Sequence, residues 1–197
     1  MSTDSEVIER SAVEPAVFAA LYDRHARVVF RYAAQRLGDH AAEDVMPETF
    51  LVAFERRSAY DLAAVDARPW LLGIATRLIR KHGRLEATAW KGMSADVAAQ
   101  VVPDLIDQSS ARIDAQRLTH RLAKALRRLS EADRETLLLY AWGELDYASI
   151  AAAMQVPIGT VRSRLNRARR QLRRAAGIDA IEQETDHGRT DTAPQNA

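Results

Sequence analysis

Residues 147–174 read YASIAAAMQVPIGTVRSRLNRARRQLRR, and this stretch decides the fold that the sequence predicts. Small and apolar residues at 149–154 predict a short helix. Pro157 suits the first turn of a second helix, where its missing N–H has no bond to make. At about 100° per residue, one narrow apolar stripe on the second helix faces inward: Ile158, Val161, Leu165, Ala168 and Leu172. Two helices joined by a tight turn predict a helix-turn-helix.

The opposite side of the second helix is cationic and rich in hydrogen-bonding groups. It carries Ser163, Asn166, Arg167, Arg170 and Arg174, with Arg162 and Arg173 on one flank and Thr160 and Arg164 on the other. No carboxylate occurs from Pro157 to Arg174. In a helix-turn-helix, residues near the start of the second helix reach base edges while flanking cations contact phosphates. This face therefore predicts a reader of the DNA major groove.

A basic amphipathic helix also has other readings. It can be a solvated surface helix, a calmodulin-type target or a membrane-surface segment. The helix that precedes this one argues against them, because Ile150, Ala151 and Met154 offer small and apolar packing partners that a lone basic helix does not need. The helix-turn-helix is thus favoured.

Composition narrows the class of protein. The chain has 197 residues, is 47% hydrophobic and contains no cysteine, which excludes disulfides, thiolate metal sites and cysteine nucleophiles. The polar N-terminus and the lack of an apolar run near about 18 residues favour a cytoplasmic protein over a secreted or membrane one. The net charge of +1 hides a segregation, since arginines crowd the helix after Pro157 and acids crowd the tail after Ala176. A DNA-binding protein with so little excess charge needs a second contact to bind tightly.

Enzymatic motifs are missing from the sequence. The histidines are scattered at positions 25, 40, 82, 120 and 187, without an HExxH pattern, and there is no GxxxxGK[ST] loop. His40 and Glu43 lie one helical turn apart, but such a pair is more typical of a solvated helix face than of a metal site. We expect no enzymatic activity, no metal or cofactor and no small-molecule substrate.

Apolar periodicity predicts helices along the rest of the chain, and strand-like alternation is scarce. The first runs from about residue 15 to 37 and ends at Gly38. The second covers about 40–57, with Val45, Phe50, Leu51 and Phe54 on its apolar side and Pro47 as a kink in a continuous helix. Further helices are expected at 69–84, from about 113 to 129, and at 131–142, where Ser130 is a plausible N-cap. The prediction is an all-α fold of two small helical domains joined by a flexible linker, which contains a short helix near 96–101.

Three segments match the sequence patterns of a known protein family. They are AEDVMPETFLVAF at 42–54, RPWLLGIATRLIRKHGR at 68–84 and LDYASIAAAMQVPIGTVRSRLNRARRQL at 145–172. In this order and spacing, the chain resembles the extracytoplasmic-function group of bacterial sigma factors, the specificity subunits of RNA polymerase. The resemblance implies sigma domain 2 at 13–84, a linker at 85–111, sigma domain 4 at 112–176 and a disordered acidic tail at 177–197.

The resemblance also implies roles for residues and partners. Domain 4 would read the promoter −35 element and contact the β flap of core polymerase, with base contacts from Arg162, Ser163, Asn166 and Arg167 and phosphate contacts from Thr160, Arg164 and Arg170. Domain 2 would melt and hold the −10 element through Tyr60, Trp70, Arg77, Arg80, Lys81 and Arg84, since an extruded base needs a stacking surface and the backbone needs cations. It would dock on the β′ clamp helices through Asp44, Glu48, Thr49 and Ala53, with Phe50 as either core or contact.

Two positions depart from the usual pattern of the family: Pro47 replaces a polar residue in the docking helix, and Arg77 replaces an asparagine near the extruded base. By habit of the family, an anti-sigma factor is a further partner. The alternative function is a stand-alone helix-turn-helix regulator that binds an operator directly, for example as a dimer with symmetric half-sites. The N-terminal block argues against it, because that block resembles neither a ligand-binding nor a receiver domain.

Overall fold

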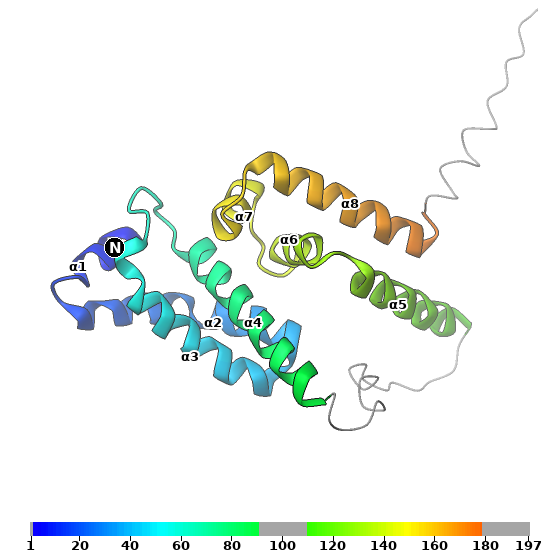
Figure 1. Ribbon diagram of the computed structural model, residues 1–197, viewed down its shortest axis with the longest axis horizontal. Helices are drawn as coiled ribbons and strands as arrows, with labels where there is room; N and C mark the ends of the chain where they lie inside the picture. The colour runs from blue at the N-terminus through cyan, green and yellow to red at the C-terminus, as the bar shows by residue number, and fades with distance from the viewer. Residues whose placement is uncertain (1, 91–109, 179–197) are drawn as a thin grey trace, which may run out of the picture. The chain divides into compact units, whose positions relative to one another are not determined.

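The computed structural model describes residues 2–90 and 110–178, with side chains described at 2–83 and 117–178. Within these ranges the chain forms eight α-helices and two short 3-10 turns, and no strand (Figure 1). This confirms the all-α fold. The chain divides into two compact units, Met1–Pro103 with Glu135–Arg162 and Asp104–Arg134 with Ser163–Ala197. Among the described helices, none combines the length and the apolar character needed to cross a membrane.

The first unit begins with a short helix that the sequence analysis did not predict, α1 (Asp4–Arg10). Thr3 caps this helix: its hydroxyl accepts the Glu6 N–H at 3.2 Å, and the Glu6 carboxylate accepts the Thr3 N–H at 3.0 Å. This capping box satisfies two N–H groups that the helix leaves without partners. Val7 and Ile8 are buried, so α1 is packed on the rest of the unit.

Two long helices follow with almost no loop between them. A 3-10 turn, η1 (Pro15–Phe18), leads into α2 (Ala19–Leu37), and α3 (Asp39–Glu55) starts directly after Gly38. Gly38 has φ 84° and ψ 166°, a backbone region that is almost reserved for glycine. The predicted helix end near Leu37 and the predicted continuous helix through Pro47 are both confirmed.

One prediction about α3 is wrong. Val45 and Phe50 are buried as expected, but Leu51 is 58% exposed. Leu51 lies seven positions after Asp44 and four before Glu55, so the helical period puts it on the polar outer face of α3. The inward positions of this turn are taken by Phe50 and Ala53.

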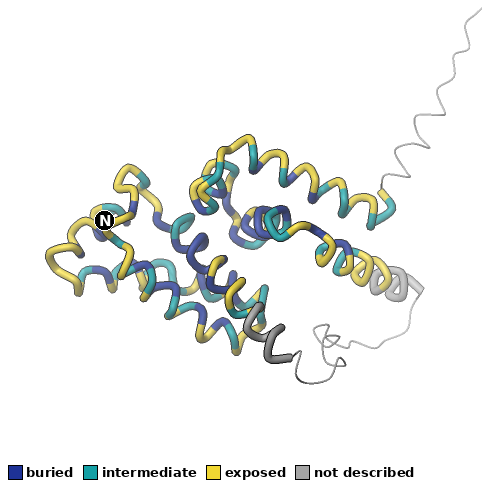
Figure 2. The backbone as a smooth tube through the Cα atoms, in the orientation of Figure 1, coloured by how far each residue is buried: buried dark blue, intermediate teal, exposed yellow. Residues whose placement is uncertain are grey.

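The next helix, α4 (Arg68–Trp90), follows the 3-10 turn η2 (Arg57–Ala59) and a loop, and it supplies much of the core of the first unit. Leu71, Leu72, Ile74, Leu78 and Ile79 are all at most 8% exposed. Figure 2 shows the resulting run of buried residues along α4. The helix continues past Arg84 into the segment where the sequence predicted a linker, and the short helix expected near 96–101 lies outside the described residues.

The helix-turn-helix is built from α6 (Glu131–Ala141), α7 (Tyr147–Met154) and α8 (Ile158–Ala176). Ser130 caps α6 as predicted, since its Oγ accepts the Asp133 N–H at 3.1 Å. Asp146 caps α7 by accepting the Ser149 N–H at 2.7 Å. Gln155 then adopts a left-handed conformation with φ 54°, which ends α7 and turns the chain towards Pro157 and α8.

The second unit contains α5 (Ser110–Arg128), the first turn of α6 and most of α8. Its described core includes Ala125 and Leu129 from the α5 side and Leu165 and Ala168 from α8, each at most 6% exposed. These small and branched residues leave the long cationic side chains of both helices at the surface. The second unit is therefore a helical frame with a strongly basic exterior.

Candidate nucleic-acid interface

The faces of α8 largely follow the helical wheel. Val161, Leu165 and Ala168 are completely buried, while Leu172 is half-buried. Ile158 departs from the prediction, because it is 41% exposed at the first residue of the helix, one turn before the stripe reaches the core. On the other side, the four predicted base readers are exposed: Arg162, Ser163, Asn166 and Arg167. Of the predicted phosphate contacts, Arg170 is exposed, and Thr160 and Arg164 are half-buried on the flank.

Arg167 is held by a carboxylate that the sequence analysis did not single out. Its Nη2 donates to Asp133 Oδ1 at 2.8 Å and its Nε donates to Asp133 Oδ2 at 3.1 Å. This two-point pairing fixes the plane of the guanidinium as well as its position. The hydrogen bond from Arg167 is the main cause that keeps the pKa of Asp133 below its ordinary value, and Asp133 in turn raises the pKa of Arg167.

The two partners differ in exposure. The side chain of Asp133 is only 10% exposed, whereas that of Arg167 is 52% exposed. The carboxylate therefore sits at the base of α8 while the arginine reaches the surface, which leaves the remaining N–H groups of the guanidinium available for a base. The sequence contained one signal for Asp133, its place in the first turn of α6 after the Ser130 cap.

The exposed side of α4 carries the cations expected near the −10 element. Arg77, Arg80 and Lys81 are exposed, and the side chain of Arg84 lies outside the described residues. Burial is the main cause that lowers the pKa of Arg77, and the neighbouring charge of Arg56 adds to the effect. Two cations in mutual repulsion favour an anion between them, such as a phosphate.

The aromatic pair at the loop before α4 is packed inward. The rings of Tyr60 and Trp70 have centroids 5.0 Å apart, and Tyr60 is only 8% exposed. The Tyr60 hydroxyl donates to the Ala64 carbonyl at 2.5 Å, and burial is the main cause that raises the pKa of Tyr60 to about 12. Trp70 is half-buried, so it offers part of its ring to a base, whereas Tyr60 would have to move with its loop.

The predicted docking residues on α3 separate into two groups. Asp44 is exposed and Glu48 is half-buried, with Glu48 Oε1 3.4 Å from Lys81 Nζ and Glu48 Oε2 3.2 Å from His82 Nε2. The hydrogen bond from His82 is the main cause that lowers the pKa of Glu48. These two carboxylates lie on the outer face of α3, where a partner can reach them.

Thr49 and Ala53 require a correction. Both are completely buried, and the Thr49 hydroxyl donates to the Val45 carbonyl one turn earlier at 2.7 Å. The helical period turns them into the core, so in this conformation they support α3 and do not form its docking face. Phe50 is also buried, with its ring 4.9 Å from that of Tyr22. The exposed Leu51, which sequence reasoning placed inside, takes their place beside the two carboxylates.

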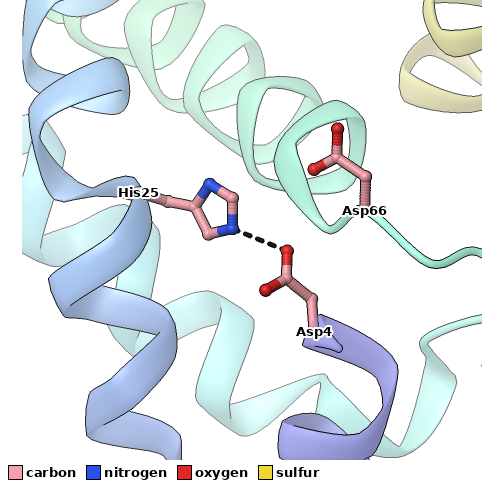
Figure 3. Close-up of side chains that lie close together, drawn as sticks. All are labelled: Asp4, His25 and Asp66. Carbon is pink, nitrogen blue, oxygen red and sulfur yellow. Dashed lines mark hydrogen bonds and ion pairs between the residues drawn. The ribbon is translucent and has the colours of Figure 1, made fainter. Parts of the chain in front are cut away.

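A cluster at the N-terminus holds the start of α4 (Figure 3). Asp4 Oδ1 accepts from Arg24 Nη1 at 2.9 Å, and Asp4 Oδ2 accepts the Ala67 N–H at 3.0 Å and lies 2.6 Å from His25 Nε2. Asp4, His25 and Asp66 can bring one ligand atom each within 4.8 Å of one another. Both oxygens of Asp4 are already bound by protein donors, so the carboxylate serves to tie α1 and α4 to α2.

Two family models and several known proteins match this chain. The model of sigma-70 region 2 matches residues 21–88 and that of sigma-70 region 4 matches residues 119–172. SigL, an ECF RNA polymerase sigma factor of Mycobacterium tuberculosis, is 34% identical over 167 residues, which cover 83% of this chain and 90% of SigL. BldN, an ECF sigma factor of Streptomyces coelicolor, is 31% identical over 182 residues, which cover 89% of this chain and 66% of BldN.

A solved structure shares the fold. The sigma factor RpoE of Bartonella quintana, in its complex with the anti-sigma factor NepR, aligns with a TM-score of 0.57 at 22% identity, and the alignment covers 82% of this chain and 98% of RpoE. Regions 2 and 4 occur here in the order that the sequence motifs predicted. With a relative above 30% identity along most of the chain, these matches show that the protein belongs to the extracytoplasmic-function family of RNA polymerase sigma factors.

Proposed function

We propose that this sigma factor reads the −35 element with the exposed start of α8 and opens the −10 element with α4 and the loop before it. As an RNA polymerase sigma factor, the chain directs core polymerase to promoter DNA. The observation that carries the assignment to α8 is its outer face, where Arg162, Ser163 and Asn166 are exposed on the side opposite the buried Val161, Leu165 and Ala168. Arginine can bind guanine through two hydrogen bonds, while serine and asparagine accept a wider range of bases.

We assign a role to each part of the chain and keep the domain boundaries that the sequence predicts. We assign −10 recognition to residues 13–84, the connection to 85–111, −35 recognition to 112–176 and a separate role to the tail at 177–197. Arg77, Arg80 and Lys81 would hold the backbone of the separated strand, and Trp70 would stack with a base. Arg84 and Tyr60 remain proposed members of this site. Thr160, Arg164 and Arg170 would contact phosphates beside the −35 element.

Docking on the β′ clamp helices is assigned to the outer face of α3. Asp44 and Glu48 supply the charge, and Leu51 supplies an exposed apolar contact between acidic neighbours. Removing the apolar surface of Leu51 from water in such a contact would add to the binding energy. The β flap is the corresponding partner of the second sigma region.

Two further properties follow from the family. Sigma factors are initiation factors without enzymatic activity, and we propose that this chain likewise leaves phosphodiester chemistry to core polymerase in the cytoplasm. RpoE was solved in complex with an anti-sigma factor, which supports the proposal that this chain also has one. The stand-alone operator-binding regulator is not favoured, because such a regulator has no use for sigma region 2.

Run-off transcription tests the proposal. Core polymerase is incubated with genomic DNA fragments in the presence and absence of this chain, and new start sites are mapped. The expected result is a set of start sites that depends on the chain and shares two elements at promoter spacing. Co-purification with core without new start sites would reject the assignment of α8 and α4, whereas binding to an operator without core would support the stand-alone regulator.

A further inference from the structure

A groove in the second unit is lined by cations from two helices. It lies between α5 and the last turns of α8 and has a volume of about 330 Å³. Arg121, Lys124 and Arg128 line it from α5, and Gln171 and Arg174 line it from α8. Ala125 and Ala175 complete the lining, and none of the described residues that line it carries a carboxylate. The groove therefore combines a largely apolar lining with several cationic groups, which suits a segment that carries both acidic and apolar side chains.

The three cations of α5 form one row. They lie three and four positions apart, so they share one face of the helix and span about 10 Å along its axis at 1.5 Å per residue. All three are exposed. Like charges at this spacing destabilise a helix when nothing neutralises them. A ligand with several negative charges in a row would relieve this repulsion along the full length of the groove.

The chain itself leaves α8 at the mouth of this groove. The helix ends at Ala176, and Gly177 turns the backbone with φ 81°. A Cβ atom at Gly177 would lie 3.5 Å from Arg121 Nη2, the first cation of the row. The described part of the chain thus ends beside the groove.

The segment that follows is acidic. It contains Asp179, Glu182, Glu184, Asp186 and Asp191 against a single arginine, Arg189. At about 3.3 Å or more per extended residue, the eight residues after Ile178 reach about 26 Å, which is ample for a row of about 10 Å. The first four acids also recur every two or three residues, so several can meet cations at once.

We propose that residues 179–186 of the same chain occupy the groove between α5 and α8 and compete there with other polyanions, DNA included. Tethering favours this occupant, because a segment joined to the same chain by a short linker has an effective concentration in the millimolar range. A separate acidic partner must reach that concentration in solution. The tail would act as an internal substitute for nucleic acid that is released when a tighter polyanion arrives.

Because the chain contains no cysteine, only introduced cysteines can form a disulfide, and the rate of its formation tests the proposal. Cysteines are introduced by Gln171→Cys in the groove and Gln183→Cys in the tail, both at uncharged positions, and disulfide formation within the full chain is timed at low salt. A disulfide requires the two Cα atoms to approach within about 7 Å. We expect the rate to fall at least tenfold when Asp179, Glu182, Glu184 and Asp186 are changed to their amides. It should fall similarly at 1 M salt, where the Debye length is about 3 Å.

Matched controls separate docking from general effects. The pair Ala152→Cys and Gln183→Cys puts the first thiol at an exposed position outside the groove, and its rate should not respond to the amide changes. Reaction of the Gln171→Cys variant alone with a small disulfide reagent corrects for any effect of nearby arginines on the thiol. The charges of the groove and the tail can also be exchanged, with Lys124→Glu and Arg128→Glu combined with Glu182→Lys and Glu184→Lys. This variant should again form the disulfide between positions 171 and 183 rapidly.

Each other outcome contradicts the proposal. An unchanged rate after the amide changes would mean that charge does not hold the tail in the groove. A covalent dimer in place of the internal disulfide would put the tail of a second copy there. A random-sequence duplex that binds the chain without slowing closure would remove the competition with DNA. These results would not affect the assignment of α8 to the −35 element, because disulfide formation is measured without promoter DNA.

Discussion

Asp133→Asn is the variant that most directly examines how this sigma factor reads DNA. The structure gives Arg167 two hydrogen bonds to the Asp133 carboxylate, at 2.8 and 3.1 Å, so the carboxylate sets the plane in which the guanidinium meets a base. Asparagine keeps the size of the side chain but offers only one acceptor and no charge. We expect Arg167 to lose its fixed orientation while it stays exposed and charged.

The expected change in folding stability is much smaller than the expected change in base preference. Arg167 is 52% exposed, so solvent screens the ion pair and its contribution to folding is small. The Tm of the variant should therefore stay close to that of the unchanged chain. A base contact made through two hydrogen bonds discriminates by about 1–3 kcal/mol, which is about 5- to 150-fold in relative affinity because about 1.4 kcal/mol is tenfold. The variant should thus lose base preference far more than stability.

The assay is competition between promoters bound by reconstituted holoenzyme. Start sites from genomic run-off transcription define the −35 element, and each base in it is then substituted in turn. Arg167→Ala should flatten the preference at one position, and Asp133→Asn should flatten the same position while affinity for random DNA rises through the lost negative charge. Asp146→Asn removes a carboxylate that caps α7 through the Ser149 N–H and has no hydrogen bond to Arg167, which makes it the matched control for the loss of charge.

One result would refute the reasoning. If Asp133→Asn raises affinity for every sequence equally and leaves the base preference intact, Asp133 only neutralises charge and does not orient Arg167. A preference that moves to a different base position would instead mean that Arg167 reads DNA in another orientation once released. Loss of binding to all sequences alike in Arg167→Ala would assign this arginine to phosphate.

Three further expectations concern docking and stability. Leu51→Ser should weaken binding to core polymerase by about tenfold, as truncation of an interface residue worth more than 1 kcal/mol does, yet leave unfolding within about 0.5 kcal/mol because Leu51 is 58% exposed; unchanged affinity in a titration with labelled core would place the docking face elsewhere. Gly38→Ala should lower the free energy of unfolding in urea by about 1–3 kcal/mol, since φ is 84° and nothing lies within 4 Å of the new Cβ; a neutral result would mean that the turn rearranges. The pKa of Asp4 is lowered, because hydrogen bonds from Ala67, Arg24 and His25 outweigh the opposing effect of burial. Its stabilisation is therefore present above the ordinary value of 3.8 and is lost as pH falls below it; Asp4→Asn should be less stable at pH 7 and respond less to acid, and parallel pH curves for the two proteins would contradict this.

The helix-turn-helix was predictable because its information is local. The stripe of Val161, Leu165 and Ala168 follows the helical period, and the Ser130 cap and the Gly38 end are chemical signals confined to a few residues. These features need no knowledge of the rest of the chain.

Other features depend on contacts that the sequence does not spell out. The partner of Arg167 lies 34 positions away, so its identity is a property of the packed helices. Leu51 was misplaced because four apolar residues at 45, 50, 51 and 54 cover more of the helix than one face holds, and only packing decides which one stays outside. The sequence analysis missed α1 because seven residues are too few to show a helical pattern of apolar residues. Thr3 and Glu6 nevertheless form the sequence pattern of a capping box.

The bond from the Ala67 N–H to Asp4 joins residues 63 positions apart, and it makes a single backbone amide a reporter for the N-terminal helix. Ala67 is completely buried, so exchange of its amide hydrogen with solvent requires the Asp4 contact to open. Measured on the free protein, the exchange rate of this one amide gives the free energy of local opening of α1. Measured during holoenzyme formation, it would reveal whether the loop before α4 is released together with α1 or independently of it.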